Sequence, residues 1–239
     1  MRPRIVCHMM TSIDGRLLPE RWTEPARGIE RSGLFRQHDA VAARFSADGW
    51  IVGRRTMQAH AKGASRSTGA GVGAGAPRRP HVADRKGRDL AVALDPRGVL
   101  QYGRDDAGGD HIVAVLSEGV SDAYLAELRE DGVSYLFAGP DGKDLAVALD
   151  RLGEAFGATT TLLEGGGIVN GAFLRAQLID EFSLLVCPAI DGLAGSPSIV
   201  EGPGSAVDMP SAGQALRFLG AEALEGGVVW LRYAVERSG

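Results

Sequence analysis

The sequence predicts a three-layer α/β fold in which helices flank a mixed, mostly parallel sheet that ends in an antiparallel hairpin. Two observations lead to this class. Strand-like and helix-like segments alternate through the middle of the chain, and two β segments joined by Glu225-Gly226-Gly227 close it. A length of 239 residues with 44% hydrophobic residues suits one α/β domain, which we expect to span residues 1–239.

Each expected element follows from its local residue pattern. Apolar or β-branched runs bounded by turn residues predict strands, at about residues 4–10, 49–53, 89–95, 111–116, 133–137, 159–163, 181–187, 215–224 and 228–235. Helical spacing of apolar residues, or a start signal such as Ser121, predicts helices, at about residues 32–47, 54–59, 122–130, 144–156 and 168–176.

One seven-residue sequence, DLAVALD, occurs twice, as Asp89–Asp95 and as Asp144–Asp150. We interpret the repeat as chance in a chain rich in alanine and leucine. The first copy runs into the turn signal Asp95-Pro96-Arg97-Gly98 and should be a strand, whereas the second continues through Leu152 and Phe156 and should be a helix. The flanking residues of each copy therefore predict its conformation.

Residues 61–80 (AKGASRSTGAGVGAGAPRRP) are rich in Gly, Ala and Ser. Such a segment can bury little apolar surface, so we interpret it as a mobile surface loop inserted in the domain. A linker between two domains is the alternative.

Charge and cysteine content exclude several classes of function. A net charge of −4 with both signs interspersed gives no footprint for nucleic acid. Cys7 and Cys187 stand in separate apolar runs and predict buried free thiols, and the histidines show no zinc-ligand spacing, so we expect no metal. The start Met-Arg-Pro-Arg runs directly into a strand and no apolar run approaches the roughly 20 residues of a membrane span, so we expect a cytoplasmic protein that contacts no membrane.

The strongest functional signal is the turn Glu164-Gly165-Gly166-Gly167 between an expected strand and an expected helix. Glycines allow a ligand close to the backbone, and the first amides and the dipole of a helix favour an anion such as a pyrophosphate. A tight turn that needs glycine only for packing is the alternative. Asn170 stands where the dinucleotide fingerprint GxGxxG requires glycine, and the motif lies too late in the chain for a doubly wound fold, so a Rossmann dehydrogenase is not expected.

The second signal is the run Gly53, Arg54, Arg55 and Thr56 at the end of an expected strand. Arginine and backbone amides suit phosphate recognition. Two adjacent arginines predict a site for the 2′-phosphate of a dinucleotide, and hence NADPH as the cofactor in preference to NADH. A solvated pair of arginines, with Thr56 capping a helix, is the alternative.

The third signal is Asp14, which follows the first expected strand within Met10–Arg16. A carboxylate in that place can hold an amino or hydroxyl group of a heterocycle or sugar. Asp14-Gly15 is also an ordinary turn dipeptide, so both interpretations stay open.

Three stretches carry a resemblance to a known family, namely HMMTSIDGRL (8–17), WIVGRRTM (50–57) and LLEGGGIVNGAFLRAQLIDEFSLLVCPAIDG (162–192). Together they resemble the RibD C-terminal domain family, the pyrimidine reductases of riboflavin biosynthesis, which have a dihydrofolate-reductase-like fold. The resemblance covers roughly residues 3–60 and 110–235.

The resemblance implies an NADPH-dependent reduction of a ribosylamino-pyrimidine 5′-phosphate to its ribitylamino form. The sugar opens to a C1′=N imine, and hydride passes from the nicotinamide C4 to C1′. The implied cofactor-binding residues, with the arginine pair included, are Gly53, Arg54, Arg55, Thr56, Ser117, Gly165, Gly166, Gly167, Ile168, Val169 and Asn170. The implied substrate-binding residues are Ser12, Asp14, Arg16 and Glu164. Asp14 and Glu164 are the catalytic candidates, because a carboxyl group whose pKa is raised by burial could protonate or polarise the opening sugar.

One departure from the family concerns the substrate phosphate. Where bacterial members continue into an acidic-Pro stretch that ends in a substrate-binding arginine, this chain has Met57-Gln58-Ala59-His60 and then the glycine-rich loop. Arg16, Arg31 and Arg36 are the candidates to replace that arginine. Reduction of another heterocycle such as a pterin, or a non-catalytic nucleotide-binding module, are the alternative functions. The resemblance also implies a homodimer, for which Phe182–Ile190 and the terminal hairpin offer apolar strands.

Overall fold

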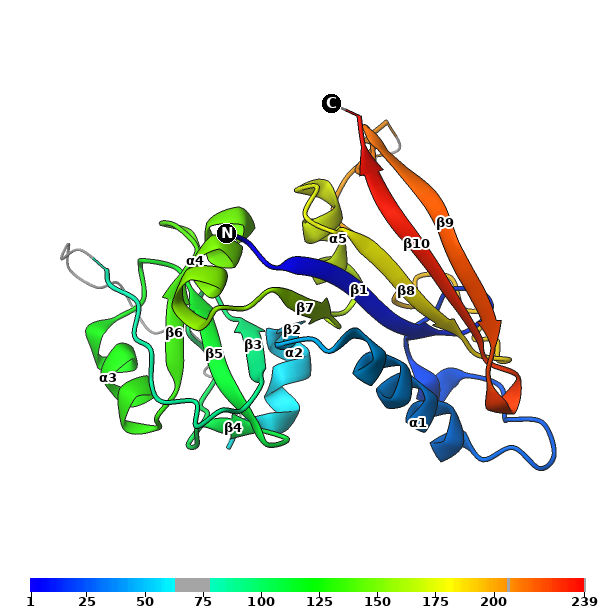
Figure 1. Ribbon diagram of the computed structural model, residues 1–239, viewed down its shortest axis with the longest axis horizontal. Helices are drawn as coiled ribbons and strands as arrows, with labels where there is room; N and C mark the ends of the chain where they lie inside the picture. The colour runs from blue at the N-terminus through cyan, green and yellow to red at the C-terminus, as the bar shows by residue number, and fades with distance from the viewer. Residues whose placement is uncertain (63–77, 206, 239) are drawn as a thin grey trace. The chain divides into compact units, whose positions relative to one another are not determined.

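The structure, a computed structural model, describes residues 1–62, 78–205 and 207–238 (Figure 1). The chain folds into two compact units, of which the first comprises residues 1–3 and 48–161 and the second begins at Arg4, runs to Ala47 and resumes at Leu162. The single domain expected over residues 1–239 stays a prediction. Most of the glycine-rich loop, residues 63–77, lies outside the described residues.

The first unit holds a mainly parallel sheet. Its strands are β2 (Gly49–Gly53), β3 (Leu90–Leu94), β4 (Asp106–Ala107), β5 (Asp110–Leu116) and β6 (Ser134–Phe137). β3 pairs in parallel with β2 and β5, β6 pairs in parallel with β5, and β4 is antiparallel to β5. Its helical segments are α2 (Arg54–Met57), the 3-10 turn η3 (Gln58–His60), α3 (Asp122–Glu130) and α4 (Leu145–Phe156).

The two copies of DLAVALD fold as their flanking residues predict. The first copy is β3, a central strand in the sheet of this unit. The second forms the start of α4, where the side chain of Asp144 accepts a hydrogen bond from the Val147 amide at 3.1 Å and Gly157 ends the helix with φ +69°. Ser121 caps α3 in the same way, by accepting from the Tyr124 amide.

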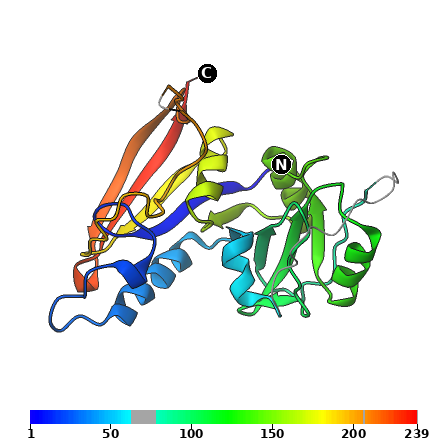
Figure 2. The same ribbon diagram turned by 180° about the vertical axis from the view of Figure 1, so that it is seen from behind.

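The second unit holds a mixed sheet whose C-terminal part is antiparallel. Its strands are β1 (Arg4–Thr11), β8 (Glu181–Val186), β9 (Gln214–Ala223) and β10 (Val229–Arg237). β8 is parallel to β1, and β10 is antiparallel to both β8 and β9, so β9 and β10 form the long hairpin that Figure 2 shows from behind. The helical segments are η1 (Pro19–Arg21), α1 (Arg31–Ala42), η2 (Ala43–Phe45), α5 (Gly167–Arg175) and η4 (Glu225–Gly227).

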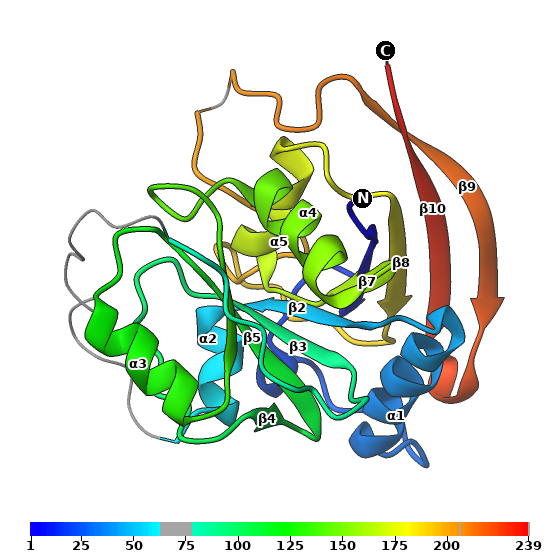
Figure 3. The same ribbon diagram turned by 60° about the vertical axis from the view of Figure 1, so that its left-hand side comes forward.

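Each unit has its own apolar core. In the first, side chains of β3, β5, β6 and α3 pack together, among them Leu116, Leu128 and Phe137. In the second, α1 covers β8 and β10 through Leu34 and Val41, which pack with Leu185 and Trp230. Figure 3 shows α1 beside the tip of the hairpin, where η4 lies. The helix is therefore held against the strands that carry most of the second core.

The predicted fold class is confirmed, since parallel strand pairs, an antiparallel C-terminal hairpin and flanking helices are all present. The remaining strand, β7 (Thr160–Leu163), contains the boundary between the units. The helix expected over residues 32–47 is shorter than predicted, because α1 ends at Ala42 and Ser46 adopts φ +45°. Cys7 and Cys187 are buried and free, as predicted. Within the described parts of the chain no helix has the length and apolar character that a membrane crossing requires.

Candidate functional site

The glycine turn joins β7 to α5 as the sequence predicts. Gly166 is the N-cap of α5 and adopts φ +47° and ψ 156°, a conformation open essentially to glycine alone. A Cβ added to Gly166 would meet no atom within 4 Å, so the backbone there borders open space. This position has the properties that close approach of an anion requires.

Packing explains two other glycines of α5. A Cβ on Gly167 would lie 2.3 Å from the Ser198 carbonyl oxygen, and a Cβ on Gly171 would lie 1.9 Å from the Glu201 carbonyl oxygen. The Glu201 amide in turn donates to the Gly167 carbonyl at 3.0 Å. Segment 198–201 therefore rests directly on the helix, and the packing interpretation accounts for both residues.

The other predicted cofactor residues of this helix have different surroundings. A Cβ on Gly165 would lie 2.6 Å from Val169 Cγ1. Asn170 is fully buried and donates from Nδ2 to the Ile199 carbonyl at 2.8 Å, whereas Ile168 is 58% exposed. Gly166 and Ile168 thus face outward, and Asn170 holds segment 198–201.

Ser12, Asp14 and the loop after β8 form one hydrogen-bonded group. Asp14 accepts from Ser12 Oγ at 2.6 Å, from the Asp191 amide at 3.1 Å and from the Gly192 amide at 2.8 Å. The Ser12 hydroxyl, and then the Gly192 amide, lower the pKa of Asp14 to about 2. The expectation that burial raises this pKa is therefore wrong, because the hydrogen-bond donors outweigh burial. Asp14 is a carboxylate at neutral pH.

Asp191 is a partner with a buried side chain that the sequence analysis missed. Its carboxylate accepts from Arg21 Nε at 3.0 Å and from Ser196 Oγ at 2.7 Å, and these two donors lower its pKa. Arg16 donates to the Ser196 carbonyl at 2.7 Å and so contacts the same loop. A signal was available, since the Ile-Asp-Gly of residues 13–15 recurs at 190–192, after the parallel neighbour of β1.

Glu164 lies beside two histidines that the sequence analysis also missed. One carboxylate oxygen of Glu164, one ring nitrogen of His8 and one of His38 lie within 4.8 Å of one another. His8 is buried, whereas His38 and Glu164 are partly exposed. No local sequence pattern predicts this group, because its members come from three separate segments: β1, α1 and the turn after β7.

The group does not have three available metal ligands. His8 Nδ1 lies 3.0 Å from Ser183 Oγ, and Nε2 lies 3.1 Å from the His38 carbonyl oxygen. Both nitrogens of His8 therefore have hydrogen-bond partners inside the protein. The other two members of the group are the Glu164 carboxylate and the imidazole of His38.

The predicted arginine pair lies in the first unit, at the carboxyl end of β2. Gly53 is the N-cap of α2, so Thr56 is inside this four-residue helix and the interpretation of Thr56 as its cap is wrong. Arg55 and Thr56 are exposed and Arg54 is half-buried. The arginine side chains are accessible to a phosphate from solvent.

The ends of β3 and β5 lie at the same edge as the end of β2, because Gly53 pairs with Leu94 and Leu94 with Val115. Ser117 follows β5 at this edge, and its amide donates to the Pro96 carbonyl at 3.0 Å. Buried Asp95 accepts from the Val99 amide at 2.7 Å and so fixes the turn that carries exposed Arg97. Arg97 is a further cation at this edge that sequence reasoning did not single out.

Comparison with known proteins gives one family and several similar structures. A family model described as the RibD C-terminal domain matches residues 3–230. A pyrimidine reductase-like protein of Corynebacterium diphtheriae is 20% identical over 98% of this chain and 92% of that chain, with a TM-score of 0.65.

Two other solved structures have the same fold. Riboflavin biosynthesis reductase Rib7 of Saccharomyces cerevisiae is 14% identical, with a TM-score of 0.58 over 98% of this chain and 90% of that chain. RibD of Acinetobacter baumannii is 20% identical, with a TM-score of 0.60, and this chain covers 58% of it. The chain thus spans little more than half of that RibD. These likenesses confirm the expected dihydrofolate-reductase-like fold.

Proposed function

Since this chain belongs to the RibD C-terminal domain family, we propose that it is an NADPH-dependent reductase of the riboflavin-biosynthesis type. Its substrate is a ribosylamino-pyrimidine 5′-phosphate, which it reduces to the ribitylamino form in the cytoplasm. The observation that carries this proposal is the family match, which extends over residues 3–230 and includes all three stretches that resemble the family.

The residues present fit a dinucleotide. Gly166 offers backbone that borders open space, at the first turn of a nine-residue helix. Residues 165–170 are the proposed cofactor-binding residues at this helix. Residues 53–56 and Ser117 are also proposed to bind the cofactor. When bound, the nicotinamide supplies the hydride.

The chain's own residues then bind and orient the substrate. Asp14 remains charged and is held by Ser12 and the amides of residues 191 and 192, so it offers a fixed acceptor for an amino or hydroxyl group. Arg16 is anchored on the Ser196 carbonyl and is the proposed partner of the substrate phosphate. Fixed polar groups of this kind orient a substrate at low entropic cost.

The test is oxidation of NADPH, followed at 340 nm, by the purified chain with a ribosylamino-pyrimidine phosphate. We expect turnover and a ribitylamino product. Oxidation only with a pterin or another heterocycle would favour the alternative substrate class. Binding of NADPH without turnover of any substrate would instead favour a nucleotide-binding module and contradict the proposal.

A homodimer is part of the proposal, and the strand pairing limits which strands can form its interface. Over residues 181–186, β8 pairs with β1 on one side and with β10 on the other, so both edges of this strand are already occupied. β9, in contrast, is the last strand in the order and has β10 as its neighbour. Its side chains Leu216 and Phe218 are 57% and 58% exposed, so we propose that a second copy covers β9.

A further inference from the structure

A buried hydrogen-bonded chain crosses the second unit from its last strand to α1. The indole Nε1 of Trp230 donates to Ser183 Oγ at 2.8 Å, and Ser183 Oγ lies 3.0 Å from His8 Nδ1. His8 Nε2 lies 3.1 Å from the carbonyl oxygen of His38. Four elements, β10, β8, β1 and α1, thus meet along one line of polar groups that ends at His38.

The donors and acceptors in this row of hydrogen bonds determine which way each hydrogen bond points. An indole N–H only donates, so Ser183 Oγ accepts from Trp230. The His38 carbonyl oxygen only accepts, so in the neutral ring Nε2 of His8 carries the hydrogen and Ser183 Oγ donates to Nδ1. Burial, and after it the neighbouring His38, lowers the pKa of His8 to about 3, so the ring is neutral at physiological pH.

His38 lies at the solvent-accessible end of this row of hydrogen bonds. Its ring lies against the ring of His8, with 4.3 Å between centroids, and its side chain is 21% exposed. Among the described residues, the titratable groups beside it include His8 from β1, Glu164 from the turn after β7, and Asp39 of its own helix, whose Oδ1 lies 3.4 Å from Nδ1.

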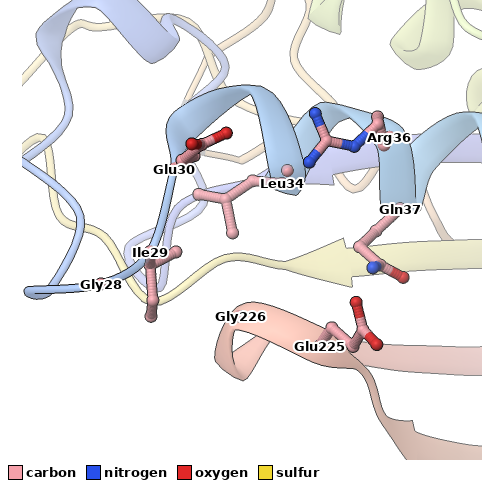
Figure 4. Close-up of a pocket in the computed structure, with 9 residues that line it drawn as sticks. Gly28, Ile29, Glu30, Leu34, Arg36, Gln37, Glu225 and Gly226 are labelled. Atoms are coloured by element: carbon pink, nitrogen blue, oxygen red, sulfur yellow. The ribbon is translucent and has the colours of Figure 1, made fainter.

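A cavity of about 340 Å³ next to α1 does not involve this ring. It lies between α1 and η4 and is lined by Gln37, Arg36 and Glu225, among others, as Figure 4 shows. Glu225, which belongs to η4, therefore lines this cavity. The carboxylate that shares the surroundings of His38 from another element is Glu164.

We infer that His38 is the proton donor of the reduction, that Glu164 stabilises its imidazolium form, and that His8 is a positioning residue held by Ser183 and Trp230. The inference rests on the proposed function and deepens it, because it assigns the acid that opening of the sugar requires. It also replaces Asp14 in that role, since Asp14 is ionised at neutral pH.

Opening of the sugar consumes one proton, which His38 supplies. The lone pair of the substrate's amino nitrogen forms C1′=N while the C1′–O4′ bond breaks, and O4′ takes the proton from the imidazolium of His38. This leaves a neutral imidazole, an open-chain hydroxyl and an iminium ion. A bound NADPH would supply the hydride for the new C1′–H bond, and the π electrons of the iminium would return to nitrogen. His38 recovers its proton from solvent.

The experiment measures single-turnover hydride transfer from NADPH between pH 5.5 and 9 for the wild type, His38→Gln and Ser183→Ala. We expect the wild-type rate to fall as the pH rises across this range, because the proposed step consumes a proton. His38→Gln should lack that pH dependence. It should also be about 100-fold slower, a rate loss within the usual range for removal of a general acid. His60→Gln, a histidine change in the first unit, is the matched control and should keep the wild-type rate and profile.

Ser183→Ala tests the positioning role. We expect a slower rate that keeps the wild-type dependence on pH, together with a change in the ¹⁵N shift of His8 Nδ1, which loses its hydrogen-bond donor. An unchanged Nδ1 shift would overturn the positioning role.

The two proposals fail in different ways. Turnover by the wild type with an unchanged rate and pH profile in His38→Gln would overturn this inference and leave the proposed function standing. Absence of wild-type turnover with any ribosylamino-pyrimidine phosphate would overturn the proposed function and this inference with it. Unfolding curves matched to the wild type establish that the His38→Gln variant is folded.

Discussion

At the scale of single residues, the site separates its carboxyl groups by their hydrogen-bond partners. Asp14 receives a hydroxyl and two backbone amides, which stabilise its charged form. Glu164 lies beside imidazole rings, which makes it a partner for a cation. We therefore propose different roles for two carboxyl groups that the sequence presents as equal candidates: Asp14 as a fixed acceptor and Glu164 as the neighbour of the proposed acid His38.

Asp14 should contribute to stability in a pH-dependent way. Its folded pKa of about 2 lies below the ordinary 3.8, so its contribution is present above pH 4 and is lost as the pH falls through 2. Urea unfolding at pH 7, 4 and 2.5 should show a smaller difference between wild type and Asp14→Asn at pH 2.5 than at pH 7. Asp150→Asn, at an exposed position of α4, is the control. An equal difference at all three pH values would contradict the role assigned to these donors.

The arginine pair gives a second prediction at this scale. Changing Arg54 and Arg55 to Ala should weaken NADPH binding by about 10- to 100-fold and leave NADH binding nearly unchanged, since charge-assisted hydrogen bonds to a phosphate contribute about 1.5–3 kcal/mol. Dissociation constants from nucleotide fluorescence give the comparison, with exposed Arg27→Ala as control. Equal weakening of both nucleotides would show that neither arginine contacts the 2′-phosphate.

At the scale of elements, local patterns predicted most strands and helices, and long-range interactions decided the rest. The two DLAVALD segments were assigned correctly because a turn follows one and apolar helical spacing follows the other. β4 was missed, since it consists of the two residues Asp106–Ala107 with no apolar run.

The surroundings of the site were less predictable than its elements. Two of the donors that lower the pKa of Asp14 are amides 177 and 178 residues away, and the setting of His38 depends on His8, 30 residues earlier on a strand. No spacing within one element reports such pairs. The recurrence of Ile-Asp-Gly after two parallel strands is the exception, because parallel neighbours bring their carboxyl ends together.

The start of α5 gives a prediction at the element scale. In Gly166→Ala, alanine has to adopt a conformation open essentially to glycine, and its methyl group enters the open space over the turn. The control is Gly157→Ala at the end of α4, where alanine has to adopt a left-handed conformation and its Cβ also meets no atom. Each change should lower the free energy of unfolding by about 1–3 kcal/mol. Gly166→Ala alone should also weaken NADPH binding, by tenfold or more in titration calorimetry. Equal NADPH affinity in both variants would favour the packing interpretation of the turn.

At the scale of the whole molecule, the hairpin raises the question of what covers its outer strand. β9 is ten residues long, a length at which an open edge invites pairing with another chain. Leu216, Phe218 and Leu219 on β9 and Val229 on β10 are all at least 39% exposed. A long edge strand with apolar side chains is typical of a surface that a second copy buries.

Phe218 is the residue at which this proposal is most sharply tested. Phe218→Glu places a charge in the middle of the strand, 58% exposed in one chain but buried if a second copy covers β9, so it should convert a dimer into a monomer. Light scattering coupled to size exclusion measures the mass, which should fall from about twice 25.1 kDa to about 25.1 kDa. Met209→Glu, also at an exposed apolar position but outside the hairpin, should leave the mass unchanged. The proposal is contradicted if the wild-type protein is monomeric at micromolar concentration, or if the Phe218→Glu variant remains dimeric. In either case β9 would not form a dimer interface.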